Sequence, residues 1–499
     1  MAHAGATTLP WGDMRQSYDG LPERFYAPPE LSPVADARLI HLNRPLAAEL
    51  GLDADWLAGP DGVAMLSASH MPQGVRPLAL AYAGHQFGHF VSRLGDGRAL
   101  LLGDVRDIHG REREIQIKGS GRTAFSRRGD GRAALGPVLR EYLLSESMAA
   151  LGVPTTRALA ALRTGETVMR EKPLPGGMIV RVAASHIRVG TFQYFAARQD
   201  VAGLRLLADF AIARHAPEAA GATHPYVAFL QGVVAAQAGL VAHWMLIGFI
   251  HGVMNTDNMA ISGETIDYGP CAFMDQYDPA TVFSFIDEHG RYAYTNQPSI
   301  ALWNLTRLAE ALLPLLSEDE DQAVEYAQQA LAGFHARFHD AYFAGMRAKL
   351  GLEGEDTQDE TLFHALLETM QATQADFTNT FRALSSGAVI DAATSADWPP
   401  AMAEAFAPWL AQWRQRIALH GTATAEERAA RMRAVNPCYI PRNHLVEAMI
   451  TAAIEHDDYA PFEEMLAVLA KPYETQPGRD HFAAPPTPQE RVQYTYCGT

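Results

Sequence analysis

The stretch that decides the fold is His251-Gly-Val-Met-Asn-Thr-Asp-Asn258, which is followed after a short interval by Asp267-Tyr-Gly269. It presents an amide, Asn258, and a carboxylate, Asp267, within one short region of the chain. Side-chain oxygens of this kind suit Mg²⁺ or Mn²⁺ when the ion also bridges phosphate groups. The stretch therefore predicts a metal-dependent nucleotide site near the middle of the chain.

The same stretch has the layout of a protein-kinase catalytic loop followed by a metal-binding loop. Kinases carry His-Arg-Asp and a later Asn, and then Asp-Phe-Gly. Here His251 and Asn258 keep that separation, but Val253 stands where the catalytic Asp is expected. Valine cannot accept a proton. Asp257 is the only acid within the loop, and two roles are open to it: it accepts a hydroxyl proton from another direction, or it orients the metal site.

Composition limits the class of protein. With 499 residues the chain is long enough for about two to four domain-sized units. A net charge of -17 argues against nucleic acid or an anionic membrane as the main partner. The first residues lack the basic start and apolar run of a secretory signal, and the three cysteines are too few for a disulfide scaffold. We therefore expect a cytosolic protein with no nucleic-acid and no membrane partner.

The patterning divides the chain into four parts. Residues 1–75 mix proline-rich loops with short helical patterns and read as an N-terminal extension, and residues 76–185 read as a strand-rich lobe. Residues 186–470 are mainly helical, and residues 471–499 form a proline-rich tail that we expect to be extended. The predicted fold class is α+β: a protein-kinase-like bilobal fold with a strand-rich N-lobe, a helical C-lobe and both terminal extensions.

Periodicity predicts the individual elements within these parts. The expected strands lie at 99–102, 114–118, 158–163, 167–170 and 178–182. The expected helices lie at 135–151, 200–215, 226–250, 299–316, 321–350, 360–385 and 401–418. The most apolar stretch, residues 233–250, contains Gln237 and His243, which favours a buried core helix over a membrane span.

A cation and a carboxylate partner follow from these elements. Lys118 ends the alternating strand Glu114-Ile-Gln-Ile-Lys118, as the kinase lysine ends its strand. Alone, such a lysine is usually a solvated edge residue. Glu141 and Glu146 share the helix at 135–151, but their faces differ by roughly 140°, so only one can face the lysine. We favour Glu141, which lies nearer the polar loop before the helix.

Glycine and arginine gather around this strand. Arg93-Leu-Gly-Asp-Gly-Arg98 forms a turn where a kinase glycine-rich loop would lie, and residues 119–131 combine glycines with arginines. Glycines let backbone amides approach phosphate oxygens, although each segment alone can be an ordinary turn. Arg181 ends a strand and Arg188 follows in Ser185-His-Ile-Arg-Val-Gly190. These two arginines can clamp a phosphate or form an inter-lobe salt bridge.

Together these segments resemble the selenoprotein O family, the YdiU-type proteins with a kinase-like fold. The resemblance covers nearly the whole length. It is strongest in YAGHQFGH (82–89), IQIKGSGRTAFSRRGDGRAALGPVLREYLLSE (115–146), SHIRVGTFQYF (185–195), HGVMNTDNM (251–259) and DYGPCAFMD (267–275). So many long matches in the same order make the resemblance specific.

The resemblance implies a protein nucleotidyltransferase. Such an enzyme would transfer AMP from ATP, or UMP from UTP, to Ser, Thr or Tyr hydroxyls of protein substrates and release pyrophosphate. The nucleotide would be bound flipped relative to kinases, with the γ-phosphate buried and the α-phosphate presented. A base at the position of Val253 would then be misplaced. The resemblance also implies Mg²⁺ or Mn²⁺ as cofactor and leans toward a monomer.

The resemblance further implies roles for individual residues. Asn258 and Asp267 would hold the metal, and Asp257 would accept the proton. The remaining positions would bind the nucleotide and its phosphates, with Glu141 paired to the lysine: Gly95, Gly97, Arg98, Lys118, Asp130, Gly131, Glu141, Arg181, Arg188 and Asp267.

Two other functions and one regulatory hypothesis stay open. The chain could be an ATP-dependent kinase of a small molecule or protein, with Asp257 replacing the lost base, or a non-catalytic ATP-binding pseudokinase regulator. Some members of the family carry a selenocysteine near the C-terminus, where this chain has Cys497. Under oxidation Cys497 could form a disulfide with Cys271 and restrain the site; the alternative is two thiols.

Overall fold

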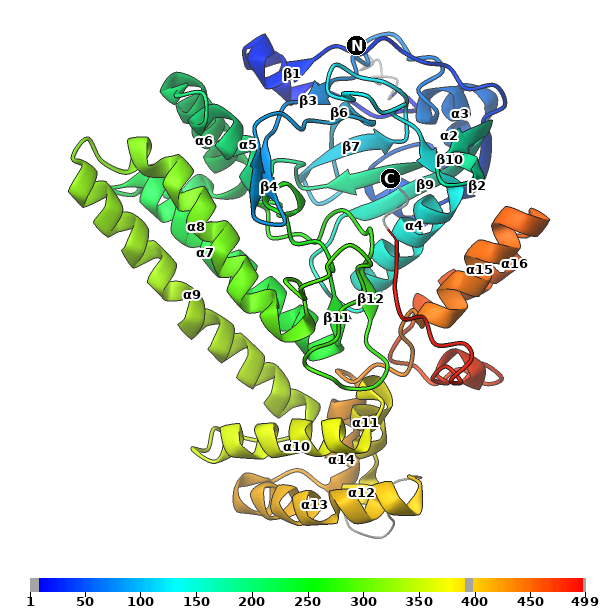
Figure 1. The fold of residues 1–499 in the computed structure, drawn as a ribbon, viewed down its shortest axis with the longest axis vertical. Coiled ribbons are helices and arrows are strands. Elements are labelled where there is room, and N and C mark those ends of the chain that lie inside the picture. The colour runs from blue at the N-terminus through cyan, green and yellow to red at the C-terminus, as the bar shows by residue number, and fades with distance from the viewer. Residues whose placement is uncertain (1–8, 391–397, 497–499) are drawn as a thin grey trace, which may run out of the picture.

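A mixed α+β architecture is seen in the computed structural model, which describes residues 9–390 and 398–496 (Figure 1). An antiparallel sheet forms the centre of the N-terminal half, and the C-terminal half is helical. The sheet order is β2-β9-β10-β7-β6, and β8 pairs with β10. These strands are β2 (Arg38–Leu42), β6 (Ala99–Arg106), β7 (Glu112–Lys118), β8 (Ala133–Ala134), β9 (Arg157–Met169) and β10 (Pro173–Ala183).

Alternation along β7 creates an apolar face and a polar face. Ile115 and Ile117 are buried in one core with apolar side chains of β6, β9 and β10. Gln116 and Lys118 point to the opposite face, because successive side chains of a strand alternate. Arg181 of β10 is the direct cross-strand partner of Gln116. The sheet thus carries a strip of polar side chains on the face that meets the rest of the protein.

Helix α4 (Leu135–Ala150) covers that polar face of the sheet. It ends where the sequence predicts, before Gly152, which takes a left-handed conformation at φ 80°. Its outer side packs against α15 (Asn443–His456) and α16 (Ala460–Leu469), as in the contact of the Tyr142 and Phe462 rings at 5.5 Å. Segments some 300 residues further along the chain therefore hold α4 in place (Figure 1). Helix α4 in turn brings Glu141 to Lys118 and Arg181 of the sheet.

The helical half is built on long antiparallel packing. Its helices are α5 (Val189–Ala196), α6 (Val201–His215), α7 (Pro225–Ile247), α8 (Gln297–Leu316), α9 (Glu320–Lys349), α10 (Asp359–Thr373), α11 (Phe377–Leu384), α12 (Gly387–Ile390), α13 (Pro400–His420) and α14 (Ala425–Arg433). Within the described ranges, α7 alone is long and apolar enough to cross a membrane by length and composition. Most of its apolar window is buried, and it packs against α8 and α9.

Short elements complete the molecule. The first residues form β1 (Tyr26–Ala27), α1 (Arg44–Glu49), α2 (Ala54–Ala58) and α3 (Pro60–Leu66). The remaining short strands are β3 (Ala79–Leu80), β4 (Gly84–Gln86), β5 (His89–Val91), β11 (Phe249–Ile250) and β12 (Ala272–Phe273). β4 and β5 form a separate hairpin, and β11 pairs with β12 on either side of the motif that opened the sequence analysis.

Two sequence predictions about elements are wrong in detail. The strands expected at 158–163 and 167–170 are one strand, β9, which pairs with β10 on both sides of Gly165, although that glycine takes a left-handed φ of 71°. The helix expected at 360–385 is two helices, α10 and α11. Gln374 is left-handed at φ 52°, and Asp376 caps the second helix by accepting from the Asn379 amide. In addition, β2 from the expected N-terminal extension joins the edge of the main sheet.

The tail, which was expected to be extended, combines extended stretches with turns at 471–474, 476–479 and 487–490 and a short 3-10 helix, Asp480–Phe482. Thr495 pairs with Ser284, so the tail returns to the loop after β12. Cys497, the partner in the disulfide hypothesis, lies outside the described residues.

Candidate active site

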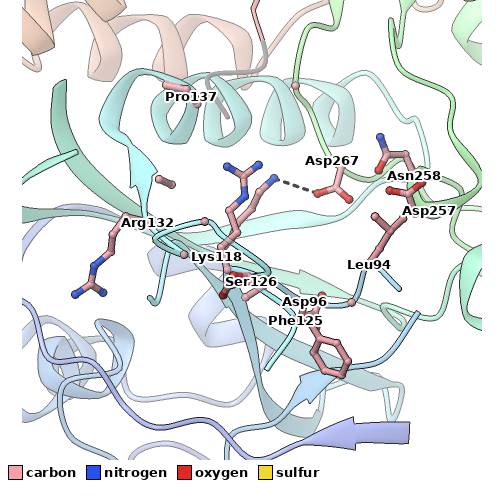
Figure 2. Close-up of a pocket in the computed structure, with 18 of the residues that line it drawn as sticks. Leu94, Asp96, Lys118, Phe125, Ser126, Arg132, Pro137, Asp257, Asn258 and Asp267 are labelled. Carbon is pink, nitrogen blue, oxygen red and sulfur yellow. Dashed lines mark hydrogen bonds and ion pairs between the residues drawn. The ribbon is translucent and has the colours of Figure 1, made fainter. Parts of the chain in front are cut away.

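A cavity of about 800 Å³ lies between the sheet, α4 and the loops that connect β11 to β12 (Figure 2). Every residue that the sequence analysis named for the site lines this one cavity: Gly95, Gly97, Arg98, Lys118, Asp130, Gly131, Glu141, Arg181, Arg188, Asp257, Asn258 and Asp267. These residues come from the strands, from the loop at 119–131, from α4 and from the motif at 251–269. The structure therefore brings together all of the predicted positions, and their roles stay predictions.

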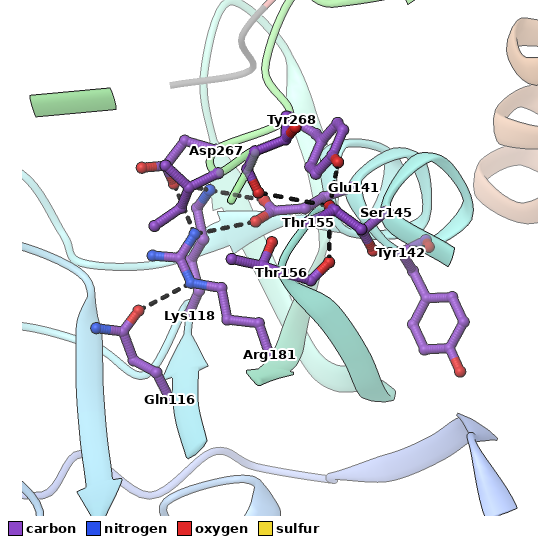
Figure 3. Close-up of polar contacts among 12 residues, drawn as sticks. Gln116, Lys118, Glu141, Tyr142, Ser145, Thr155, Thr156, Arg181, Asp267 and Tyr268 are labelled. Carbon is purple, nitrogen blue, oxygen red and sulfur yellow. Dashed lines mark hydrogen bonds and ion pairs between the residues drawn. The ribbon is translucent and has the colours of Figure 1, made fainter. Parts of the chain in front are cut away.

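Three cations converge on one carboxylate at the inner wall of the cavity. Figure 3 shows two of them, Lys118 and Arg181, beside Asp267. Lys118 Nζ lies 3.0 Å from Asp267 Oδ1, and Arg181 Nη1 lies 2.6 Å from the same atom. Arg188 Nη1 donates to Asp267 Oδ2. Burial would raise the pKa of Asp267, but the three cations together hold that pKa well below its usual range. Asp267 is therefore a carboxylate at any pH near neutrality.

Glu141 is the second carboxylate of this group. Its Oε2 lies 2.6 Å from Lys118 Nζ, and its Oε1 lies 3.0 Å from Arg181 Nη1. Glu146, on another face of α4, instead pairs with Arg157 at 2.7 Å. Of the two acids considered from the sequence, Glu141 is thus the one that faces the lysine. The cluster carries three positive and two negative side chains, so it retains a net positive charge in a buried place.

The motif at 251–258 contributes the other wall. His251 is buried, and its Nε2 lies 2.9 Å from the carbonyl oxygen of Ile266, so the ring connects the two loops. Asn258 Nδ2 donates to the carbonyl oxygen of Val253 at 3.0 Å. The side-chain oxygen of Asn258, Oδ1, takes no part in this hydrogen bond. Val253 lines the cavity at the position where a kinase would carry its base.

Asp257 is almost fully buried beside these groups. Its Oδ2 accepts from Gln86 Nε2 at 3.2 Å, while its Oδ1 has no hydrogen-bond partner among the described residues. Arg188 donates to the main-chain carbonyl of Asp257, which ties this residue to the cation cluster. Burial raises the pKa of Asp257 to about 6, and the charge of Arg188 opposes the rise. A carboxylate that lines the cavity and has a raised pKa is suited to accept a proton.

Residues 13–470 match the protein-family model described as "Protein adenylyltransferase SelO". The chain belongs to the SelO family. It is 61% identical over 490 residues to a protein named "Protein nucleotidyltransferase YdiU" from Bradyrhizobium sp. strain BTAi1, with 97% of this chain and 99% of that protein covered. Proteins of the same name from Bradyrhizobium sp. strain ORS 278 and Rhodopseudomonas palustris strain BisB5 are 60% and 59% identical over 490 residues, with 97% of this chain and 99% and 98% of those proteins covered. The resemblance seen in the motifs is confirmed, and with it the predicted enzyme class: the chain is a protein adenylyltransferase.

The SelO site contains polar residues that sequence reasoning missed. Gln116 Oε1 accepts from Arg181 Nε at 2.8 Å, and Gln116 Nε2 donates to Asp96 Oδ2 at 3.0 Å. Asp96 is buried, which raises its pKa to about 6, and it also accepts from the Leu80 amide. This chain of contacts fixes the guanidinium of Arg181. The sequence did contain a signal for Gln116, because Gln116 is a polar residue on the same face of strand β7 as Lys118.

The β4–β5 hairpin is the second missed part of this SelO site. Gln86 and Phe87 line the cavity, and the Phe87 amide donates to Asn255 Oδ1 at 3.0 Å. Tyr82, just before the hairpin, lies beneath the guanidinium of Arg188, 4.7 Å from ring centroid to Cζ. The segment was quoted for the family resemblance, but composition gave no sign that it would reach the catalytic-type loop.

The donor set of the SelO site fits a hard divalent cation. Figure 2 shows Asp257, Asn258 and Asp267 gathered on one side of the cavity, and their side chains offer oxygen. In the described parts of the chain, no group of three or more His, Cys, Asp or Glu could hold a metal by itself. Mg²⁺ commonly takes one or two protein oxygens together with phosphate oxygens. The residues present therefore suit an ion that arrives with a nucleotide.

Proposed function

We propose that this chain transfers AMP from ATP to Ser, Thr or Tyr hydroxyls of protein substrates and releases pyrophosphate. Membership of a family of protein adenylyltransferases supports the reaction class. The observation that carries the proposal is the buried, net positive cluster of Lys118, Arg181 and Arg188 around Asp267. Transfer of UMP from UTP is the same chemistry, and we propose it as the second activity of the same site.

The cation cluster favours a flipped nucleotide. The terminal phosphates of ATP carry most of its charge, and buried arginines bind such charge strongly because little water competes. Arg181 and Arg188 are each 2% exposed, so they lie at the inner end of the cavity. Phosphates held there leave the α-phosphate nearer the opening. An acceptor hydroxyl that enters from outside then meets the α-phosphorus first.

The reaction follows from that orientation. The acceptor oxygen forms a bond to the α-phosphorus, and the bond from that phosphorus to the oxygen bridging to the β-phosphate breaks. The Asp257 carboxylate, which lines the cavity, takes the hydroxyl proton. Lys118 and the two arginines stabilise the charge that develops on the departing pyrophosphate. Because Val253 stands where a kinase carries its catalytic Asp, no carboxylate at that position repels the phosphates.

We propose that Asn258 and Asp267 hold Mg²⁺ or Mn²⁺ when the nucleotide is bound. Bound there, the metal would neutralise phosphate charge and polarise phosphate oxygens. In the structure the carboxylate of Asp267 is paired with the three cations. Triphosphate oxygens would draw those cations away and release the carboxylate for the metal.

We propose a protein-kinase-like bilobal fold for this chain. The pairing of Lys118 with Glu141 and the order of the motif after β11 support it. The proposed division keeps an N-lobe at 76–185, a C-lobe at 186–470, and extensions at 1–75 and 471–499, with β2 added to the N-lobe sheet by the first extension. A monomer in the cytosol is the proposed state, supported by the family resemblance and the low cysteine count.

Labelled ATP tests the proposal directly. Purified protein is incubated with Mg²⁺ or Mn²⁺, a mixture of bacterial proteins, and ATP labelled at either the α- or the γ-phosphorus. We expect covalent label in protein from α-labelled ATP only. Label from γ-labelled ATP alone would identify a kinase and overturn the proposal. No transfer by protein that binds ATP and metal would identify a non-catalytic regulator.

A further inference from the structure

A group of large apolar side chains is exposed beside the cavity. Phe285 is 54% exposed, Ile286 59%, Tyr494 51% and Tyr496 64%. The Phe285 ring contacts both tyrosine rings, at centroid distances of 5.8 Å to Tyr494 and 5.2 Å to Tyr496. We call these four residues the aromatic patch. Contiguous exposed apolar groups of this kind are uncommon on soluble proteins and mark interaction sites.

The backbone around the aromatic patch is rigidly held. Ser284, just before Phe285, is buried, and so is Asp287, just after Ile286. Asp287 accepts from the amides of Arg291 and Tyr292 at 2.9 and 2.8 Å. The fold thus buries the residues on both sides and turns Phe285 and Ile286 outward. Their exposure is imposed by the surrounding structure and is not the fraying of a loop.

The tail is anchored in the same way. Thr495 is buried between the two exposed tyrosines, and its amide donates to the Phe283 carbonyl at 2.7 Å. Its hydroxyl donates to the carbonyl of Pro270, which lines the cavity just after Asp267-Tyr-Gly269. Figure 1 shows the tail, in red, returning toward the middle of the molecule. The tail therefore adds two aromatic rings at a fixed place next to the metal-binding loop.

The aromatic patch is continuous with the cavity. Ile286 belongs to the patch and also lines the cavity. From the same loop, the Tyr292 hydroxyl donates to Asn255 Oδ1 at 2.7 Å, two residues before Asp257. A polypeptide lying on the patch would therefore extend directly to the opening where the acceptor hydroxyl must enter.

We propose that the aromatic patch binds the acceptor protein through an apolar side chain close to the hydroxyl that is modified. The proposal rests on the proposed function, which requires a polypeptide to reach the α-phosphate beside Asp257. The patch offers aromatic and aliphatic surface, so the complementary acceptor carries Leu, Ile, Phe or Met next to its Ser, Thr or Tyr. An extended segment suits the site, because only a thin chain can present a hydroxyl at the opening while its neighbour packs on the rings.

Paired peptides test the proposal. Each pair shares one acceptor, Ser, Thr or Tyr, which is flanked by Leu and Phe in one peptide and by Gly and Gln in the other. Label transfer from α-labelled ATP is measured for the wild type, for the F285S/Y494S variant and for L419S. Leu419 is 64% exposed at the end of α13, away from the cavity, and serves as the matched control. Neither Phe285 nor Tyr494 lines the cavity, so nucleotide affinity should be unchanged in the double variant.

We expect the wild type and L419S to modify the apolar peptides at least tenfold more efficiently, mainly through a lower KM. In F285S/Y494S that preference should fall to about twofold or less. Equal use of both peptides by the wild type, or an undiminished preference in F285S/Y494S, would overturn the docking proposal and leave the transferase proposal standing.

Peptide binding separates a failure of docking from a failure of chemistry. Fluorescein-labelled peptides are titrated with protein that holds a non-hydrolysable ATP analogue, and anisotropy is recorded. If the wild type transfers no label, the proposed function fails, but the anisotropy still tests the docking proposal. Tighter binding of the apolar peptide by the wild type, lost in F285S/Y494S, supports docking. Equal binding of the two peptides by the wild type overturns docking. Analytical ultracentrifugation then measures the oligomeric state of both proteins. If the wild type is a dimer that F285S/Y494S converts to a monomer, the occupant is a second copy and the proposal is wrong.

Discussion

A Cβ atom placed on Gly84 would lie 2.6 Å from Oδ1 of Asp257. Strand β4 is therefore in direct contact with the carboxylate that we propose as proton acceptor, and a glycine is needed for the approach. Gln86, two residues further along the hairpin, donates to the other oxygen of the same carboxylate. The hairpin thus contacts both carboxylate oxygens of Asp257 and fixes their position.

Gly84→Ala should displace Asp257 and lower the rate of AMP transfer. A shift on the order of 1 Å in a reacting group can cost about 100-fold in rate, so we expect a loss of about 10- to 100-fold in kcat. The KM for ATP should change little, because the cations lie on other elements. Gly232→Ala is the control: its Cβ would meet no atom within 4 Å, and it should leave the rate unchanged. A wild-type rate in Gly84→Ala would show that the position of Asp257 is unimportant.

The rate of transfer should depend on pH through Asp257. Burial raises the pKa of this carboxyl to about 6, and only the deprotonated form can take the hydroxyl proton. We therefore expect kcat to fall about tenfold per pH unit below about 6 and to level off above it. The measurement is the pH profile of label transfer with saturating ATP. A flat profile from pH 5 to 8 would be incompatible with Asp257 as the base.

Asp257→Asn should abolish that profile and stabilise the fold. The folded-state pKa is raised above the unfolded value of 3.8, so the wild type loses stability as pH rises from about 4 to 6 and keeps the loss above that range. Two pKa units correspond to about 3 kcal/mol. This is the upper limit of the increase in unfolding free energy that Asp257→Asn can give at pH 7. Urea unfolding at pH 4.5 and 7.5 measures it, and the gain should be smaller at pH 4.5. A variant that is less stable than the wild type at pH 7.5 would contradict this account.

The sequence predicts those parts of the site that follow from local pattern. Alternation in β7 orients Lys118, helical periodicity separates Glu141 from Glu146, and motif spacing identifies Asn258 and Asp267. The same local rules explain the success with α4, whose end is marked by Gly152. Local pattern failed at Gly165, where a glycine within a strand is easily mistaken for a turn.

Contacts between distant segments could not be predicted in this way. Gln86 and Asp257 are 171 positions apart, and no period or turn signal connects them. The bond from Gln116 to Asp96 depends on where the turn at 93–98 folds back, which is a tertiary property. The same is true of the aromatic patch, because Phe285 and Tyr496 meet only when the tail pairs with Ser284.

Asp267→Ala should abolish AMP transfer and destabilise the protein without nucleotide. The variant leaves Arg181 and Arg188 buried with too little negative charge, and removing one partner from a buried ion cluster typically costs about 3–5 kcal/mol. The folded-state pKa of Asp267 is well below the unfolded value of 3.8, so its contribution is complete above about pH 4 and is lost only as pH falls through the folded-state value; the gap between wild type and variant should be smaller at pH 3 than at pH 7 but still present. Thermal unfolding at pH 7 and 3 measures this.

Tripolyphosphate supplies an internal control for that variant. It should raise the Tm of Asp267→Ala more than that of the wild type, because the three cations are then free of their carboxylate.

Lys118→Ala should retain the fold and lose most of the transfer activity through weaker triphosphate binding. If Asp267→Ala and Lys118→Ala both kept near wild-type transfer, the site assignment would be wrong.

Lys349→Met should stabilise the helical half of the protein. Lys349, at the end of α9, is 3% exposed, and its Nζ lies 4.0 Å from the ring centroid of Phe381. Burial lowers its pKa from 10.5 to about 7, a penalty of at most about 5 kcal/mol that the ring contacts partly offset. The unfolded chain binds the proton more tightly, so the penalty is complete below pH 7 and disappears as pH rises toward 10.5. Urea unfolding should show a gain of a few kcal/mol at pH 6.5 and a smaller one at pH 9.5, whereas Lys471→Met, whose side chain is 64% exposed, should change little at either pH. A gain that is equal at both pH values would mean that methionine stabilises by packing alone and that Lys349 keeps an ordinary pKa.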